Sequence, residues 1–104
     1  MLFLTYWELN EDIPARERLA VAKKLTSSGY FPAKEIKVLR WDLTPDNWGI
    51  LLLEADNAID VAHALNSWRT ALAGGFKLTK TSPAIPIVEG LPAIEKTLEE
   101  VSAL

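Results

Sequence analysis

Residues 43–55 read LTPDNWGILLLEA, and this stretch decides the fold. The proline, aspartate and asparagine at positions 45–47 are typical of a β-turn. The run from Trp48 to Ala55 has a continuous apolar centre, which predicts a strand that is buried on both faces. The residues before the turn, Glu35–Leu43, alternate imperfectly, with Ile36 and Val38 on one face and Leu39, Trp41 and Leu43 on the other. We therefore expect two strands joined as a hairpin.

One strand and one helix are expected before this hairpin. Residues Leu2–Glu8 are apolar and aromatic except for Thr5, which predicts a largely buried strand. Pro14 stands where the first turn of a helix tolerates proline, and Gly29 is suited to end that helix. Between them the apolar residues recur at helical spacing, at Ala15, Leu19, Ala22 and Leu25.

A second helix, a fourth strand and a last helix are expected after the hairpin. Asp56 and Asn57 are both good N-caps. The apolar stripe that follows is the most regular in the chain and consists of Ala58, Val61, Ala62, Leu65, Trp68 and Leu72. Residues Phe76–Thr81 alternate as a strand does, and Pro83 and Pro86 extend the chain beyond it. Pro92 then opens the last helix.

The element order β-α-β-β-α-β predicts an α+β, ferredoxin-like domain with a four-stranded antiparallel sheet, strand order 4-1-3-2, plus a C-terminal helix. This order places the first and third strands in the centre, and they are the most continuously apolar strands. The charges lie on the outer strands, at Lys37, Arg40, Asp42, Lys77 and Lys80. Charged edges also discourage unwanted strand pairing.

The two faces of this sheet cannot both be covered by two helices. A sheet with one solvated face should alternate between apolar and polar residues, yet the third strand is apolar on both faces. The C-terminal helix, a ligand or a second copy of the chain could cover the second face. We expect a homodimer through this face, because closed two-fold dimers are the commonest oligomers. Residues 1–104 are then a single domain, in which residues 83–104 form an extended segment and a helix suited to pack on the partner.

Composition excludes several classes of function. The 104 residues have a net charge of −3 and contain no cysteine, so neither phosphate neutralisation nor thiolate chemistry is supported. No stretch reaches the ~20 apolar residues of a membrane span, and the N-terminus has no basic region of a signal peptide. We therefore expect a cytoplasmic protein with no nucleic-acid or membrane partner. A single histidine excludes a histidine metal site, and no cofactor-binding motif occurs.

Several segments of the sequence resemble the corresponding segments of one known protein family. The strand LFLTYW at 2–7, the run NWGILLLEAD at 47–56, a helix ending in Trp68 and the close TSP at 81–83 are similar to a bacterial family of small uncharacterised proteins. That family is a domain of unknown function within the dimeric α/β-barrel group. The resemblance covers most of the chain and implies this fold and a dimer. The wider group includes cofactor-independent monooxygenases, haem-degrading enzymes and lactone isomerases, but no catalytic motif of theirs matches here.

The ligand-binding candidates are Trp7, Trp41, Arg40, Glu54 and His63. Tryptophans on strands, including Trp48, could line an aromatic pocket, although tryptophan is also enriched at dimer interfaces. Glu54 ends an apolar run and would be a catalytic candidate if buried, but a carboxylate at a strand end normally reaches solvent. His63 could act as a general base, but its helix face is away from the apolar stripe that contains Trp68, a position typical of the surface.

No residue is therefore assigned as catalytic or metal-binding. The leading hypothesis is a non-catalytic homodimeric domain that binds a small apolar or aromatic molecule or acts as an interaction module. The alternative is a small cofactor-independent monooxygenase- or isomerase-like enzyme, in which the substrate supplies most of the reactivity. A purely structural subunit of an assembly is a third possibility. The discriminating feature is an aromatic-walled cavity that Glu54 or His63 lines.

Overall fold

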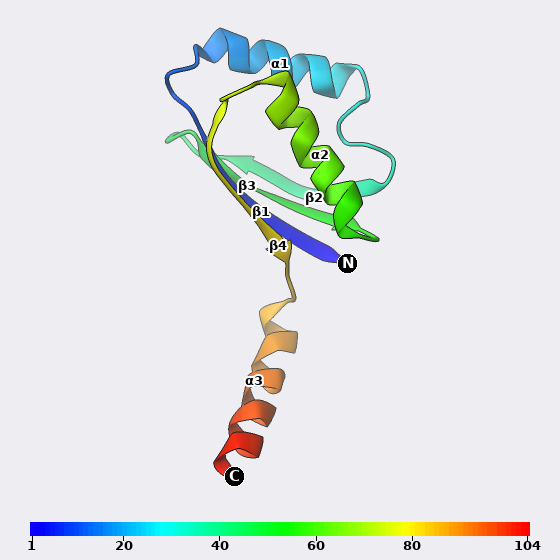
Figure 1. Ribbon diagram of the computed structural model, residues 1–104, viewed down its shortest axis with the longest axis vertical. Helices are drawn as coiled ribbons and strands as arrows, with labels where there is room; N and C mark the ends of the chain where they lie inside the picture. Colours follow the sequence, from blue (N-terminus) through cyan, green and yellow to red (C-terminus); the bar gives the residue numbers. More distant parts are fainter.

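The computed structural model describes residues 1–104 and has four strands and three helices (Figure 1). Their order is β1 (Leu2–Leu9), α1 (Ala15–Ser27), β2 (Ile36–Leu43), β3 (Trp48–Ala55), α2 (Ala58–Ala71), β4 (Phe76–Pro83) and α3 (Ile87–Ser102). The strands form one antiparallel sheet of order β2-β3-β1-β4, which is the predicted order counted from the other edge. The helices α1 and α2 lie on one side of the sheet.

The β2–β3 hairpin forms at the predicted turn. The Thr44 N–H donates to the Trp48 carbonyl at 2.8 Å, and the Asn47 N–H donates to the Thr44 carbonyl at 3.1 Å. Asn47 has a φ of 60°, in the left-handed region that asparagine tolerates better than most residues. The turn therefore depends on Asn47, whose side chain faces α1.

Local signals also define α1 and α2. Gly29, with a φ of +77°, follows α1, and glycine adopts this conformation without the steric cost of a Cβ atom. Of the two possible caps before α2, Asn57 is the N-cap, because its side-chain oxygen accepts from the Asp60 N–H at 3.0 Å. The inward residues of α2 are Val61 and Ala64. The predicted stripe is therefore correct at Val61 and Leu72, which are buried, and wrong at Ala58 and Ala62, which are exposed.

The core lies between α2 and the central strands. Phe3 of β1 pairs with Leu53 of β3, and both are at most 3% exposed. The odd-numbered residues of these two strands face the helices, and Thr5 and Leu51 continue that face. Thr5 is buried and shares a 2.9 Å hydroxyl–hydroxyl hydrogen bond with Thr81 of β4, so its polar group is satisfied.

A β-bulge corrects the predicted faces of β2. The register with β3 shifts between Val38 and Arg40, so Trp41 pairs with Leu51. Trp41 therefore lies on the same, helix-facing side as Ile36 and Val38, and the prediction of opposite faces is wrong. The physical reason is that one extra residue in a strand inverts the alternation beyond it.

The last helix also differs from the prediction. Helix α3 begins at Ile87, after Pro86, so Pro92 lies inside the helix rather than at its start. Figure 1 shows α3 extending away from the sheet, and the molecule is 58 Å in its longest dimension. None of the α3 residues is buried. Its apolar side chains, at Ile87, Val88, Leu91, Ile94, Leu98 and Val101, are each more than half exposed.

The sheet face opposite α1 and α2 also presents apolar side chains. Leu4 of β1, Trp48 of β3 and Leu78 of β4 are 42%, 38% and 38% exposed. We name this surface, formed by the even-numbered residues of β1 and β3 with their neighbours, the outer face. The exposed Glu54 also belongs to it, at its end. No helix of the chain has the length and apolar character required to cross a membrane.

Candidate functional site

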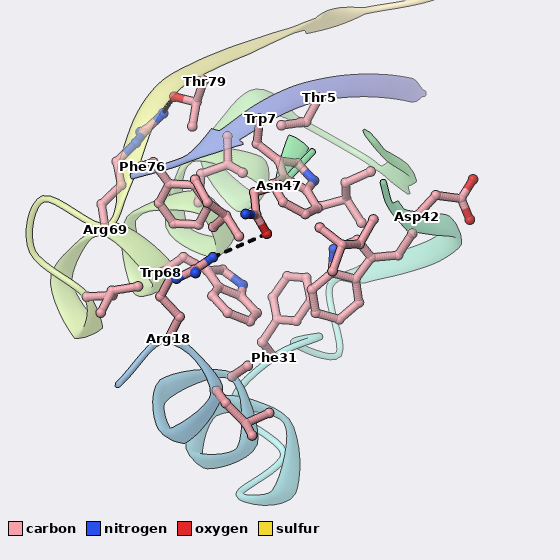
Figure 2. Close-up of a pocket in the computed structure, with 18 of the residues that line it drawn as sticks. Thr5, Trp7, Arg18, Phe31, Asp42, Asn47, Trp68, Arg69, Phe76 and Thr79 are labelled. Carbon is pink, nitrogen blue, oxygen red and sulfur yellow. Dashed lines mark hydrogen bonds between the residues drawn. The ribbon is translucent and has the colours of Figure 1, made fainter. Parts of the chain in front are cut away.

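A cavity of about 510 Å³ lies between the sheet and the helices α1 and α2 (Figure 2). Of the 19 residues that line it, 13 are hydrophobic. They come from every strand, from both of these helices and from the loops between elements: Thr5, Trp7, Leu9, Ala15, Arg18, Leu19, Ala22, Phe31, Trp41, Asp42, Leu43, Asn47, Leu51, Leu65, Trp68, Arg69, Leu72, Phe76 and Thr79. This volume is within the range of pockets that hold small organic molecules.

Three aromatic rings form one wall of the cavity. Phe31, Trp41 and Trp68 contact one another edge to face, with ring centroids 5.2 Å apart for Phe31–Trp41, 5.3 Å for Phe31–Trp68 and 5.5 Å for Trp41–Trp68. Phe31 is 1% exposed, whereas Trp41 is 42% exposed. The buried ring of Phe31 therefore anchors the two indoles, which present apolar surface to the cavity. We name these three residues the aromatic triad.

A second aromatic pair, Trp7 and Phe76, also lines the cavity. Its ring centroids are 6.4 Å apart and the planes are nearly perpendicular. Trp7 pairs with Gly49 across the strands β1 and β3. A Cβ atom at position 49 would overlap the Trp7 indole and the Asp42 carbonyl oxygen. Glycine at this position therefore allows the indole of Trp7 to lie against the sheet.

The polar groups of the lining are few, and two of them are arginines. Arg18 of α1 donates from Nε to the Ile13 carbonyl at 3.2 Å and from Nη1 to the Asn47 side-chain oxygen at 3.5 Å. Arg69 of α2 donates to the Asn66 side chain and to the Thr79 hydroxyl. Figure 2 shows the Arg18–Asn47 contact and the Arg69–Thr79 contact as dashed lines.

The structure brings together two of the five candidate residues, because Trp7 and Trp41 both line the cavity. Arg40 does not line it. This side chain is exposed and forms an ion pair with Asp42, and both the hydrogen bond and the charge of Asp42 raise the pKa of the Arg40 guanidinium above its ordinary value.

Glu54 and His63 lie away from the cavity. Glu54 is exposed at the end of the outer face, beside a shallow depression that Met1 and Lys37 also line. His63 is exposed on α2 and contacts Tyr30, with ring centroids 5.7 Å apart and 3.4 Å between its Nε2 and the Tyr30 hydroxyl. An aromatic-walled cavity lined by Glu54 or His63 would have favoured an enzyme. The cavity has the aromatic wall, but neither Glu54 nor His63 lines it.

Sequence reasoning missed Arg18, Phe31 and Arg69, and it assigned Trp68 to the core. Trp68 does pack against the core, but it is only partly buried and also lines the cavity. Phe31 stands in the loop between α1 and β2, where no periodic pattern marks a residue as buried.

Two solved structures have a similar fold. One is a protein from Bacteroides thetaiotaomicron named for the antibiotic biosynthesis monooxygenases, with a TM-score of 0.60, 13% sequence identity, and coverage of 83% of this chain and 88% of that one. The other, from Agrobacterium tumefaciens, has a TM-score of 0.53, 11% identity and coverage of 83% and 93%. No protein-family model and no curated protein sequence matches the chain.

These likenesses concern the fold. The chain has the ferredoxin-like α+β fold that its sequence predicts, and this fold is similar to that of the two proteins. At identities of 11% and 13%, no functional residue of these two proteins can be assigned to a position in this chain.

Proposed function

We propose that this protein is a homodimeric domain that binds a small apolar or aromatic molecule in the cavity between the sheet and the helices α1 and α2. The observation that carries this proposal is the aromatic triad beside a cavity of about 510 Å³. Edge-to-face aromatic clusters offer flat apolar surface on which a ring can stack. Trp7 and Trp41, already candidates from the sequence, then contact the ligand directly.

The chemistry of the lining favours binding over catalysis. Asp42, Arg18 and Arg69 are the only charged residues of the lining, and the Asp42 side chain pairs with Arg40 on the outer face. General acid–base catalysis needs a titratable group within hydrogen-bond reach of the reacting atom. Neither Glu54 nor His63 lies in the lining, so neither residue can supply such a group there, and the apolar lining is suited to holding a molecule.

A neutral fluorescent probe tests the proposal. N-Phenylnaphthylamine emits strongly only in apolar surroundings, and we expect its emission to rise on binding to the protein. Ala22→Phe places a ring in the cavity lining and should abolish that rise. The matched variant Ala20→Phe adds the same ring to an exposed position of α1 and should leave it unchanged. Equal emission with all three proteins would mean that the probe does not bind in the cavity.

The outer face and α3 support the homodimer. Apolar residues occupy the centre of the outer face, and Lys37, Arg40, Asp42 and Lys80 lie toward its edges, which is the arrangement of a protein–protein interface. The exposed stripe of α3 is the other uncovered apolar surface of the chain. A helix of 16 residues and a strand of 8 residues are both about 25 Å long. A second copy would therefore cover both surfaces, with α3 packed on the partner.

Native mass spectrometry of the full chain tests the dimer. We expect twice the chain mass at micromolar concentration. Leu4→Lys in the outer face and Leu98→Lys in α3 should each shift the protein toward monomer, because each would bury an unpaired charge. Ile59→Lys, at an exposed position of α2 on neither surface, should remain dimeric. A wild-type monomer would exclude the dimer, and a response to Leu4→Lys alone would remove α3 from the interface.

The second candidate function is oxidation of the bound molecule by oxygen without a cofactor. The observation that favours it is the fold likeness to a protein named for the antibiotic biosynthesis monooxygenases. In such a reaction one oxygen atom becomes a carbonyl on the substrate, and the other leaves as water with the two hydrogens that the substrate loses. Oxygen uptake with 1,5-dihydroxynaphthalene would support it if Ala22→Phe abolished the uptake and Ala20→Phe did not.

A further inference from the structure

Two positive charges of the cavity have no negative partner. The carboxylate of Asp42, the only acidic residue of the lining, is paired with Arg40. The other ion pair of the chain joins Lys96 to Glu100 in α3. Arg18 and Arg69 therefore face the cavity without a carboxylate, and Figure 2 shows them on the side opposite Asp42.

Neutral oxygens hold both guanidinium groups in position. Arg18 is bonded to the Ile13 carbonyl and the Asn47 side chain, and Arg69 to the Asn66 and Thr79 side chains. A guanidinium group has five N–H donors, so each arginine retains three for another partner. These hydrogen bonds hold the two guanidinium groups beside the cavity. Because none of the acceptors carries a charge, the positive charge of each arginine is not neutralised.

The sign of this charge is opposite to that of the whole chain. The protein has a net charge of −3, yet both charges that remain unpaired at the cavity are positive. A concave site with low-dielectric walls concentrates the field of the charges that line it. The apolar walls therefore select rings, and the two arginines select an anion at one end of them.

We propose that the ligand of the cavity is an aromatic carboxylate, with its ring against the aromatic triad and its carboxylate on Arg18 and Arg69. This inference rests on the proposed ligand-binding function and names the class of ligand. The planar guanidinium group matches the two oxygens of a carboxylate, and hydrogen bonds between charged partners are about twice as strong as neutral ones. A neutral aromatic molecule of the same size has only the apolar contacts.

A matched pair of probes tests the inference. 2-Naphthoate and 2-naphthalenemethanol share one ring system and differ in charge, and binding of each is measured by isothermal titration calorimetry. We expect the wild type to bind naphthoate about tenfold more tightly, and to lose that preference as ionic strength rises. Arg69→Gln, a change at an exposed side chain, should weaken naphthoate binding about five- to tenfold and leave naphthalenemethanol binding unchanged. Arg18→Gln should act in the same way.

Two further variants distinguish an effect of the positive charge at the cavity from an effect of charge elsewhere on the chain and from a loss of folding. Lys24→Gln removes an exposed cation of α1 outside the lining and should change neither affinity. Arg18→Lys keeps the charge but not the planar guanidinium group, so it should retain only part of the preference for naphthoate, even if Arg18→Gln weakens both probes through loss of its contacts with Ile13 and Asn47.

Equal binding of the two probes by the wild type would overturn the inference and leave the proposed function intact. The same follows if Lys24→Gln has as large an effect as Arg69→Gln. Binding of neither probe would instead contradict the proposed function itself.

Discussion

The indoles of Trp41 and Trp68 meet edge to face, with centroids 5.5 Å apart and an angle of 77° between the planes, although one residue lies on the edge strand β2 and the other near the end of α2. Phe31 contacts both rings from the loop that joins α1 to β2. These contacts connect the edge of the sheet to the helix layer beside the cavity. The aromatic triad therefore contributes to the stability of the fold as well as to the cavity wall.

Replacing the ring of Trp41 should measure that contribution. Aromatic pairs add about 0.5–1.5 kcal/mol beyond the area they bury. We expect Trp41→Leu to lower the free energy of unfolding by about 1–2 kcal/mol in urea titrations, and Trp41→Phe to lower it by roughly half as much, because a smaller ring still meets Phe31 and Trp68. Equal losses in the two variants would show that the edge-to-face geometry contributes nothing.

A side chain at Gly49 should destabilise the fold. Because a Cβ atom there would overlap the Trp7 indole and the Asp42 carbonyl oxygen, Gly49→Ala requires the sheet to shift, at a cost of about 1–3 kcal/mol. The control is Gly90→Ala in α3, where the nearest atom is 3.4 Å away and alanine is a better helix former. Thermal unfolding should show a clearly lower melting temperature for Gly49→Ala and no decrease for Gly90→Ala. An unchanged melting temperature for Gly49→Ala would contradict the close approach.

The N-cap of α2 should matter to both stability and binding. Asn57→Ala removes the acceptor of the Asp60 N–H and should cost about 1 kcal/mol, measured by chemical denaturation. Asn57→Ser retains an acceptor and should cost less than half of that. Since α2 carries both Trp68 and Arg69, we expect the alanine variant to weaken probe binding slightly as well. A serine variant as unstable as the alanine variant would mean that the side-chain bond is not the cause.

The phenol of Tyr6 should titrate late. Its hydroxyl donates to the Glu8 carboxylate at 2.8 Å, and this bond, together with desolvation and the charge of Glu8, raises the pKa of Tyr6 above the ordinary 10.0. Because the folded-state pKa exceeds that of the unfolded chain, the bond stabilises the native state below about pH 10 and ceases to do so as the pH rises through the raised value.

The chain has two tyrosines, so Tyr30→Phe leaves Tyr6 as the only phenol. The near-ultraviolet absorbance of tyrosinate, followed against pH in this background, should then have a midpoint above 10. Adding Glu8→Gln should move the midpoint down, because a neutral amide neither carries the charge nor accepts as strongly. A midpoint that does not respond to this substitution would exclude Glu8 as the cause.

Sequence patterns between neighbouring residues were sufficient to predict most of the fold. The turn at 45–47, the apolar run of β3 and the periodic stripe of α2 each depend on neighbours in the sequence, and the observed order β2-β3-β1-β4 follows from them with the handedness of β-α-β connections. The same patterns indicated that two helices leave one apolar face of the sheet uncovered. Trp7 and Trp41 were also identified in this way, as aromatic residues on strands.

The site itself depended on contacts between distant residues. The bulge after Val38 turns Trp41 toward the helices. The pattern of apolar and polar residues in β2 does not reveal that one strand has an extra residue. Arg18 and Arg69 belong to different helices, and only the packing of α1 and α2 over the sheet places both beside one cavity. The amino-acid sequence alone therefore determined the elements, because these arise from local hydrogen bonding and periodic burial. Tertiary structure decided which of their side chains share a cavity, because that depends on how far each helix stands from the sheet.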